Sequence, residues 1–182
     1  MNKIKLALLD MNNNHANQGM KNIREISQQF KETSAENVEV TVFDVRYKNE
    51  MPDVEEFDIF ISSGGPGNPH REGYEWEQKF ADFLDEVWEH NKNSEQKKFL
   101  FLICHSFQLA SIHWKLGNIC KRKSYSFGVM PIHKTYQGEN DFLLKNLPEP
   151  FYAVDSRAYQ FIEPDHKKLD EMGMKIVGLE KV

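Results

Sequence analysis

The segment "FLFLICHSFQLA" (residues 99–110) decides the fold, because in it a strand pattern passes into a helix pattern with no intervening loop. The run 97–104 has the length of a strand and is apolar from Phe99 onward, and 105–117 has the length of a helix that Gly117 would end. A buried strand followed at once by a helix is typical of a parallel α/β sheet. The residue at the junction, Cys104, is therefore expected at the carboxyl end of a strand.

The chain before this segment repeats the same alternation of strands and helices. Three further apolar runs predict strands over 4–10, 38–45 and 57–63. Apolar residues at spacings of three and four predict amphipathic helices over 20–30 and 73–91. Long crossovers between apolar strands indicate a three-layer, doubly wound, mostly parallel α/β sheet of the flavodoxin-like kind, with helices on both faces.

The pattern changes after Gly117. The segments 118–135 and 151–161 are strand-like and contain turn residues, which predicts extra antiparallel strands at one edge of the sheet. The segment 174–182, "MKIVGLEKV", begins like a further core strand. The length favours one domain over residues 1–182.

Composition narrows the classes of partner. The 182 residues are 40% hydrophobic and 28% charged with a net charge of −5, and the short basic run 121–123 is no footprint for nucleic acid. No apolar stretch approaches the roughly 20 residues of a membrane span. The two cysteines, Cys104 and Cys120, show no zinc-ligand spacing, so we expect a reduced, cytoplasmic protein with neither a metal nor an organic cofactor. We interpret Cys120 as structural.

Cys104 has two interpretations. A cysteine that closes an apolar strand is most often a small buried side chain. However, a thiol between a strand end and a helix N-terminus is favoured as a thiolate nucleophile, and backbone N–H groups there can bind an oxyanion. The glycine-rich "SGGPGNP" (63–69) follows the preceding strand and is expected at the same sheet edge. Two such features on consecutive strands favour the nucleophile.

These motifs resemble the class I, triad-type glutamine amidotransferase domains, including those of GMP synthases. The segment "ISSGGPGNP" (61–69) is similar to the family's oxyanion loop, and "FLICHSFQLA" (101–110) to its nucleophile elbow. "FGVMPIHKT" (127–135) resembles the glycine-containing pair of strands that follows the elbow in this family. The resemblance implies a glutaminase that passes ammonia to a synthetase subunit or domain, with glutamine or a γ-glutamyl compound as its substrate.

The resemblance also implies roles for particular residues. Cys104 would attack the glutamine amide and form a thioester, and Gly65 and His105 would donate backbone N–H groups to the oxyanion. Gly64 and Gln108 would help to bind the substrate. The segment 155–161, "DSRAYQF", would place Ser156 and Arg157 beside the pocket.

The chain departs from the family pattern at three points. Leu102 and Ser106 replace the glycines that flank the family's nucleophile, and Arg157 replaces a histidine, which alters the pocket or suits an anionic group. No His-Pro-Glu segment, which carries the family's general base, occurs in the sequence. Either the sequence stops before the last strands and that segment, or the protein has lost its base. His15 and His70 fall on loops at the expected active edge and are candidates to line the pocket.

Two alternatives therefore remain open. One keeps Cys104 as a nucleophile in a γ-glutamyl hydrolase or another cysteine-elbow hydrolase. The other is a catalytically inactive relative that binds a metabolite or a partner protein.

Overall fold

The computed structural model describes residues 3–180, which form two compact units with the boundary between His113 and Trp114. The first unit contains a four-stranded sheet in the order β2-β1-β3-β4, and all its neighbouring strands are parallel. Its elements are β1 (Lys3–Asp10), α1 (Gln18–Thr33), β2 (Asn37–Asp44), α2 (Val45–Lys48), β3 (Ile59–Ser62), α3 (Glu75–Asn93), β4 (Phe99–Leu102) and α4 (His105–His113). The parallel α/β sheet predicted from the sequence is confirmed.

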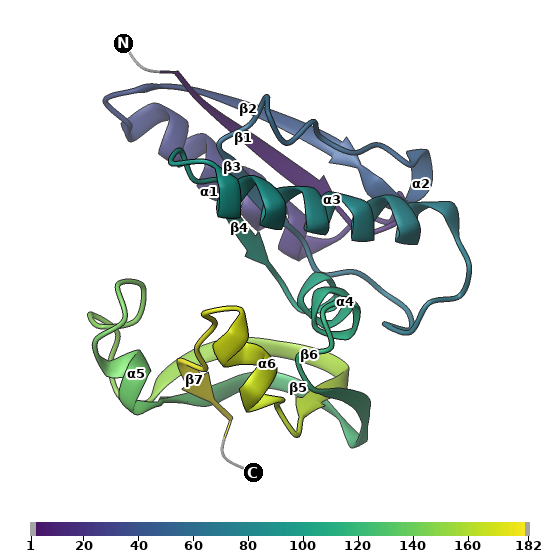
Figure 1. Cartoon of the computed structure of the whole chain (residues 1–182), viewed down its shortest axis with the longest axis vertical. Helices are drawn as coiled ribbons and strands as arrows, with labels where there is room; N and C mark the ends of the chain where they lie inside the picture. The colour runs from purple at the N-terminus through teal and green to yellow at the C-terminus, as the bar shows by residue number, and fades with distance from the viewer. Residues whose placement is uncertain (1–2, 181–182) are drawn as a thin grey trace. The chain divides into compact units, whose positions relative to one another are not determined.

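Helices cover both faces of this sheet (Figure 1). Leu8 of β1 is fully buried and clusters with Met20 of α1. On β3, Phe60 pairs with Ala7 of β1, whose side chain points to the face opposite Leu8. The Phe60 ring packs edge to face against the ring of Phe83 in α3, with 5.2 Å between the ring centroids. Burial of each such large apolar side chain contributes about 1.5–3 kcal/mol. The three-layer arrangement is confirmed, and it aligns the carboxyl ends of β3 and β4.

The second unit is built on an antiparallel sheet in the order β6-β5-β7. Its elements are β5 (Asn118–Lys134), α5 (Tyr136–Glu139), β6 (Phe151–Ile162), α6 (His166–Glu171) and β7 (Gly178–Leu179). The predicted antiparallel strands are present, but they form a sheet of their own and are longer than short edge pieces.

Two sequence predictions of element bounds are wrong. Over 174–180 only Gly178–Leu179 is a strand, and it pairs antiparallel with β5 instead of joining the parallel core; residues 181–182 lie outside the described range. The helix expected to reach Gly117 ends at His113. Lys115, with φ of 55°, adopts the left-handed conformation expected of Gly117. Gly117 is instead needed for space, because a Cβ there would lie 2.7 Å from the Phe161 ring.

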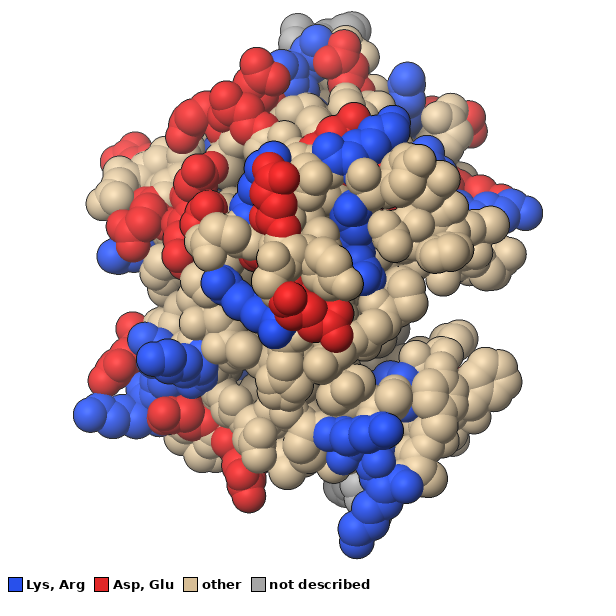
Figure 2. Space-filling model, turned by 90° about the vertical axis from the view of Figure 1, so that its right-hand side faces the viewer, with Lys and Arg blue, Asp and Glu red and all other residues tan. Residues whose placement is uncertain are grey.

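Charged side chains of both signs are interspersed over the face shown in Figure 2. That face is therefore not a continuous basic groove of the kind that follows a nucleic acid backbone. Among residues 3–180, no helix combines the length and the apolar character that crossing a membrane requires.

Candidate active site

Cys104 lies at a sharp turn between β4 and α4. The N–H of Ile103 still donates to the carbonyl of Ser62 in β3 at 3.0 Å, and α4 begins at His105. Between them, Cys104 has a φ of 51°, in the left-handed region, where a non-glycine residue stores about 1–3 kcal/mol of strain. A strained residue on a strand-to-helix turn has the backbone arrangement of a nucleophile elbow. Cys104 is solvent-exposed, so a substrate can reach it.

The first turn of α4 directs backbone donors toward this turn. The N–H of Gln108 closes the first helical turn on the Cys104 carbonyl at 3.0 Å. His105 is the first residue of α4, and the N–H of Ser106 donates back to the carbonyl of Ile103 at 3.2 Å, so the His105 N–H belongs to the helix N-terminus beside Cys104. A helix N-terminus stabilises negative charge on the thiolate and on an oxyanion formed beside it.

The glycine loop after β3 lies against Cys104. A Cβ at Gly64 would stand 3.3 Å from the Cys104 Cβ and 4.0 Å from its Sγ. A Cβ at Gly65 would stand 2.4 Å from the carbonyl oxygen of Met11, a separation too short for any side chain to be accommodated there. Glycine is thus required at 65 because the chain after β1 passes directly beside the loop. The structure brings together the two segments that the sequence motifs single out.

Ser106 ties the elbow to the glycine loop. Its fully buried hydroxyl donates to the carbonyl of Ser63 at 2.5 Å and accepts from the Ser62 hydroxyl at 2.7 Å. The Ser63 hydroxyl in turn accepts from the N–H of Met11 at 3.0 Å. The serine that replaces a family glycine therefore has a full set of partners, and the elbow forms with it in place.

Comparisons with known proteins agree with this geometry at the level of fold. No family model matches the chain, and no curated protein matches it. Solved structures do match. A glutamine amidotransferase from Thermotoga maritima has a TM-score of 0.66 and 16% identity, over 89% of this chain and 64% of that one. The glutaminase domain of CTPS from Trypanosoma brucei, with bound acivicin, has a TM-score of 0.66 and 12% identity, over 98% and 75%.

The chain has the fold of a glutamine amidotransferase domain. A third structure, that of a GMP synthase subunit from Thermoplasma acidophilum, has a TM-score of 0.54 and 15% identity, over 89% of this chain and 69% of that one. The chain spans 64% to 75% of the lengths of these three proteins. The fold implied by the sequence resemblance is confirmed.

The turn at Cys104 gives a first prediction. Ser106→Ala is expected to lower the free energy of unfolding by about 1–3 kcal/mol. The reason is that the buried Ser62 hydroxyl loses its acceptor and the buried Ser63 carbonyl loses its donor. Urea denaturation measures the change. Ser111→Ala is the matched control, since that hydroxyl is equally buried but bonds the Phe107 carbonyl within its own helix, and its loss is expected to change stability by less than about 0.5 kcal/mol. Equal destabilisation by the two variants would contradict the claim that the Ser106 hydroxyl joins the elbow to the glycine loop.

His105 is buried behind the elbow. Its side chain is 2% exposed, and its Nε2 has no hydrogen-bond partner among the described residues. Burial, and secondarily the positive charge of Arg46, lower the pKa of His105 to about 4, while Glu77 acts in the opposite direction. The ring is neutral near pH 7 and is too weak a base there to activate a nucleophile.

This pKa gives a second prediction. Because the unfolded chain binds a proton at His105 that the folded chain excludes, stability is expected to fall as pH drops from 6.5 toward 4, by up to about 3 kcal/mol. Well above pH 6.5 the ring is neutral in both the folded and the unfolded chain, so this loss of stability is absent there. Denaturation curves of the wild type and of His105→Gln, measured across this range, isolate the effect from that of the carboxylates. Parallel pH dependence in both proteins would show that the ring is not the cause.

Gln108 lies on the buried side of α4. It is 6% exposed and one helical turn beyond Cys104, so its position is compatible with the substrate-binding role that the resemblance implies. That role stays a prediction.

Ser156 and Arg157 lie in β6 of the second unit, where both have partners. The Ser156 hydroxyl is 2.7 Å from the Tyr125 hydroxyl. The Arg157 guanidinium pairs with Asp155 through Nε at 2.9 Å and with Glu180 through Nη2. The Glu180 carboxylate also accepts a bidentate pair of hydrogen bonds from the Arg122 guanidinium, each 3.0 Å long. Sequence reasoning missed this network, and its carboxylates neutralise the charge that would clamp an anionic ligand.

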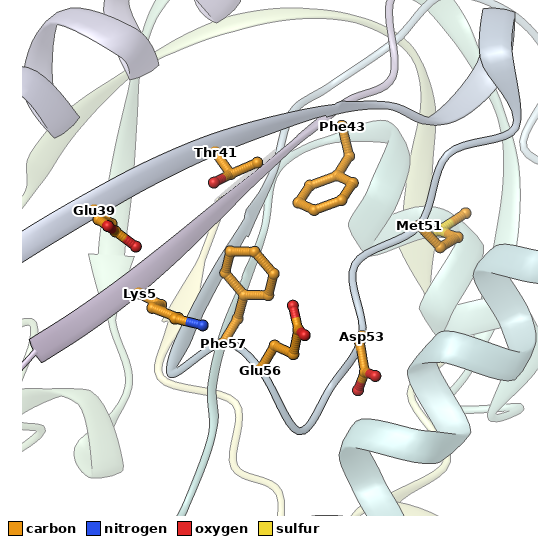
Figure 3. Close-up of a pocket in the computed structure, with 8 residues that line it drawn as sticks. All are labelled: Lys5, Glu39, Thr41, Phe43, Met51, Asp53, Glu56 and Phe57. Carbon is orange, nitrogen blue, oxygen red and sulfur yellow. The ribbon is translucent and has the colours of Figure 1, made fainter.

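A pocket of about 470 Å³ lies elsewhere on the first unit (Figure 3). Two of its walls are the rings of Phe43 and Phe57, which pack edge to face with 5.4 Å between the ring centroids. The lining consists of Lys5, Glu39, Thr41, Phe43, Met51, Asp53, Glu56 and Phe57. It contains none of the candidate catalytic residues and no thiol or imidazole, so we do not assign it to the candidate site at Cys104.

Proposed function

We propose that this protein hydrolyses the side-chain amide of glutamine through a thioester on Cys104. The observation that carries the proposal is the elbow itself: an exposed cysteine at φ of 51°, with the glycine loop so near that a Cβ added at Gly64 would lie 3.3 Å from the Cys104 Cβ. A strained nucleophile beside two sets of backbone donors suits attack on a carbonyl carbon, where an oxyanion must be stabilised.

The reaction begins when the Cys104 thiolate forms an S–C bond to the amide carbon, and the carbonyl oxygen becomes an oxyanion that accepts hydrogen bonds from the N–H groups of Gly65 and His105. Collapse of this tetrahedral intermediate breaks the C–N bond, and the leaving nitrogen takes a proton from solvent water and departs as ammonia. A second water molecule then attacks the thioester and gives up a proton to solvent, the C–S bond breaks to restore the Cys104 thiolate, and glutamate is released. The sequence contains no His-Pro-Glu, so the family's proton-transfer histidine has no counterpart among these residues.

We further propose that the ammonia is used by a synthetase subunit or domain. Two of the similar structures are a CTPS glutaminase domain and a GMP synthase subunit, which supports a partner of this class. Cys104 and Cys120 form no disulfide, which suits the reducing cytoplasm, where we place the reaction.

The natural protein, incubated with glutamine, is expected to release ammonia and glutamate in equal amounts, as measured by NMR with amide-15N glutamine. Asparagine is the matched control substrate, since it carries the same amide one methylene closer to the backbone. γ-Glutamyl peptides test the alternative hydrolase. Turnover of those peptides without turnover of glutamine would replace the proposed substrate, and no turnover of either would favour an inactive relative.

A further inference from the structure

Arg46 reaches from α2 to both sides of the glycine loop. Its Nη1 donates to the carbonyl of Pro66 at 2.5 Å and to the carbonyl of Met11 at 3.3 Å. Pro66 directly follows Gly65, and the Met11 carbonyl is the atom that stands 2.4 Å from a Cβ built at Gly65. One guanidinium therefore joins the two chain segments that enclose Gly65.

The guanidinium itself is held in place. It lies over the ring of Trp76 at 4.8 Å from the centroid, a cation–π distance, and Trp76 is buried in α3. The guanidinium also lies beside Gly67, since a Cβ there would stand at the van der Waals distance of 3.6 Å from Nη2. Arg46 is thus a rigid connection between the helical layer and the loop.

The far end of the loop is fastened separately. The Glu77 carboxylate, 5% exposed, accepts the N–H groups of Glu72, Gly73 and Tyr74 at 2.8–3.1 Å. Because that end has its own anchor, the segment that depends on Arg46 is the short stretch from Gly64 to Gly67.

We propose that Arg46 is a positioning residue that holds the Gly64–Gly67 backbone so that the Gly65 N–H meets the oxyanion formed at Cys104. The inference rests on the proposed function. A donor aimed at an oxyanion acts mainly in the transition state, so its displacement lowers kcat more than it raises KM.

Two measurements on the natural protein test the inference. In hydrogen exchange followed by mass spectrometry, Arg46→Ala is expected to speed exchange of the non-proline amides of 63–68, among which the Ser63 N–H donates to the Leu9 carbonyl at 3.0 Å, while the amides of 72–77 keep their protection. In glutamine hydrolysis, kcat is expected to fall about tenfold to a hundredfold with KM changed less than about threefold. Arg46→Lys, which keeps a cation that can reach one carbonyl, is expected to fall between the wild type and Arg46→Ala in both measurements.

Arg71→Ala is the matched control, since that side chain comes from the same loop but bonds Gln78 at the surface, and neither measurement is expected to change near Cys104. Unchanged exchange at 63–68 in Arg46→Ala would overturn the inference whether or not the protein is active. A loosened loop with unchanged kcat, or a rise in KM alone, would overturn it as well. A wild type without hydrolysis would instead overturn the proposed function, and the exchange result would still decide whether Arg46 holds the loop.

Discussion

Replacing Cys104 with serine is expected to lower glutamine hydrolysis by about 10⁴-fold or more, because a hydroxyl at the elbow is ionised far less readily than a thiol. The loss is expected in kcat, with folding unaffected, since the two side chains differ by one atom. Steady-state kinetics and a denaturation curve on the same sample measure both. Cys120→Ser is the control: Cys120 accepts from Gln160 within the second unit at 3.6 Å, and its replacement is expected to leave kcat within about twofold. Equal activity of Cys104→Ser and the wild type would remove the thioester from the mechanism.

Cys104→Gly adds an independent sign of an active-site elbow. Glycine adopts a φ of 51° without the Cβ penalty, so this inactive variant is expected to be more stable than the wild type by about 1 kcal/mol. Cys104→Ala retains the strained conformation and serves as its reference. A Gly variant no more stable than the Ala variant would indicate that the turn is unstrained.

Gly65→Ala has the second-largest expected effect. The added Cβ would lie 2.4 Å from the Met11 carbonyl, so the loop must move and take its N–H away from the oxyanion. We expect kcat/KM to fall about 10²–10³-fold, the typical loss for one oxyanion donor.

Gly73→Ala is the matched control for that prediction. It also lies in the loop and has a positive φ of 89°, but a Cβ there meets no atom within 4 Å. It is expected to cost about 1 kcal/mol of stability with activity within about threefold of the wild type. Similar losses of activity in the two variants would mean that a general disturbance of the loop, and not displacement of the Gly65 N–H, is responsible.

The parallel half of the fold was predictable because its signals are local. The apolar runs of β1 and β3 and the stripe from Trp76 to Val87 are buried as their spacing predicts. The antiparallel half was less predictable, because buried and exposed residues do not alternate regularly along β5 and β6. The pairing of these two strands also shifts register between Lys121 and Ser126. The two-residue β7 depends on pairing with β5, which no local pattern in 174–182 reveals.

Some residues of the candidate site were likewise predictable from local sequence, and others were not. Cys104 and Gly64 could be placed together because each ends a neighbouring parallel strand, and the structure sets them side by side. Arg46 could not be found from its own sequence context, "DVRYK", because its role arises from three distant contacts with Met11, Pro66 and Trp76. The pairing of Arg157 with Glu180 was likewise hidden, since 23 residues separate them.

The central claim, that Cys104 is a nucleophile built to receive glutamine, is tested most directly by intact-mass spectrometry of the natural protein after treatment with a glutamine-mimicking diazoketone. The thiolate forms an S–C bond, dinitrogen leaves, and a proton is taken up. We predict one adduct, mapped by peptide analysis to Cys104, absent in Cys104→Ser and slowed by excess glutamine. No adduct, or one at Cys120 that glutamine does not slow, would contradict the account.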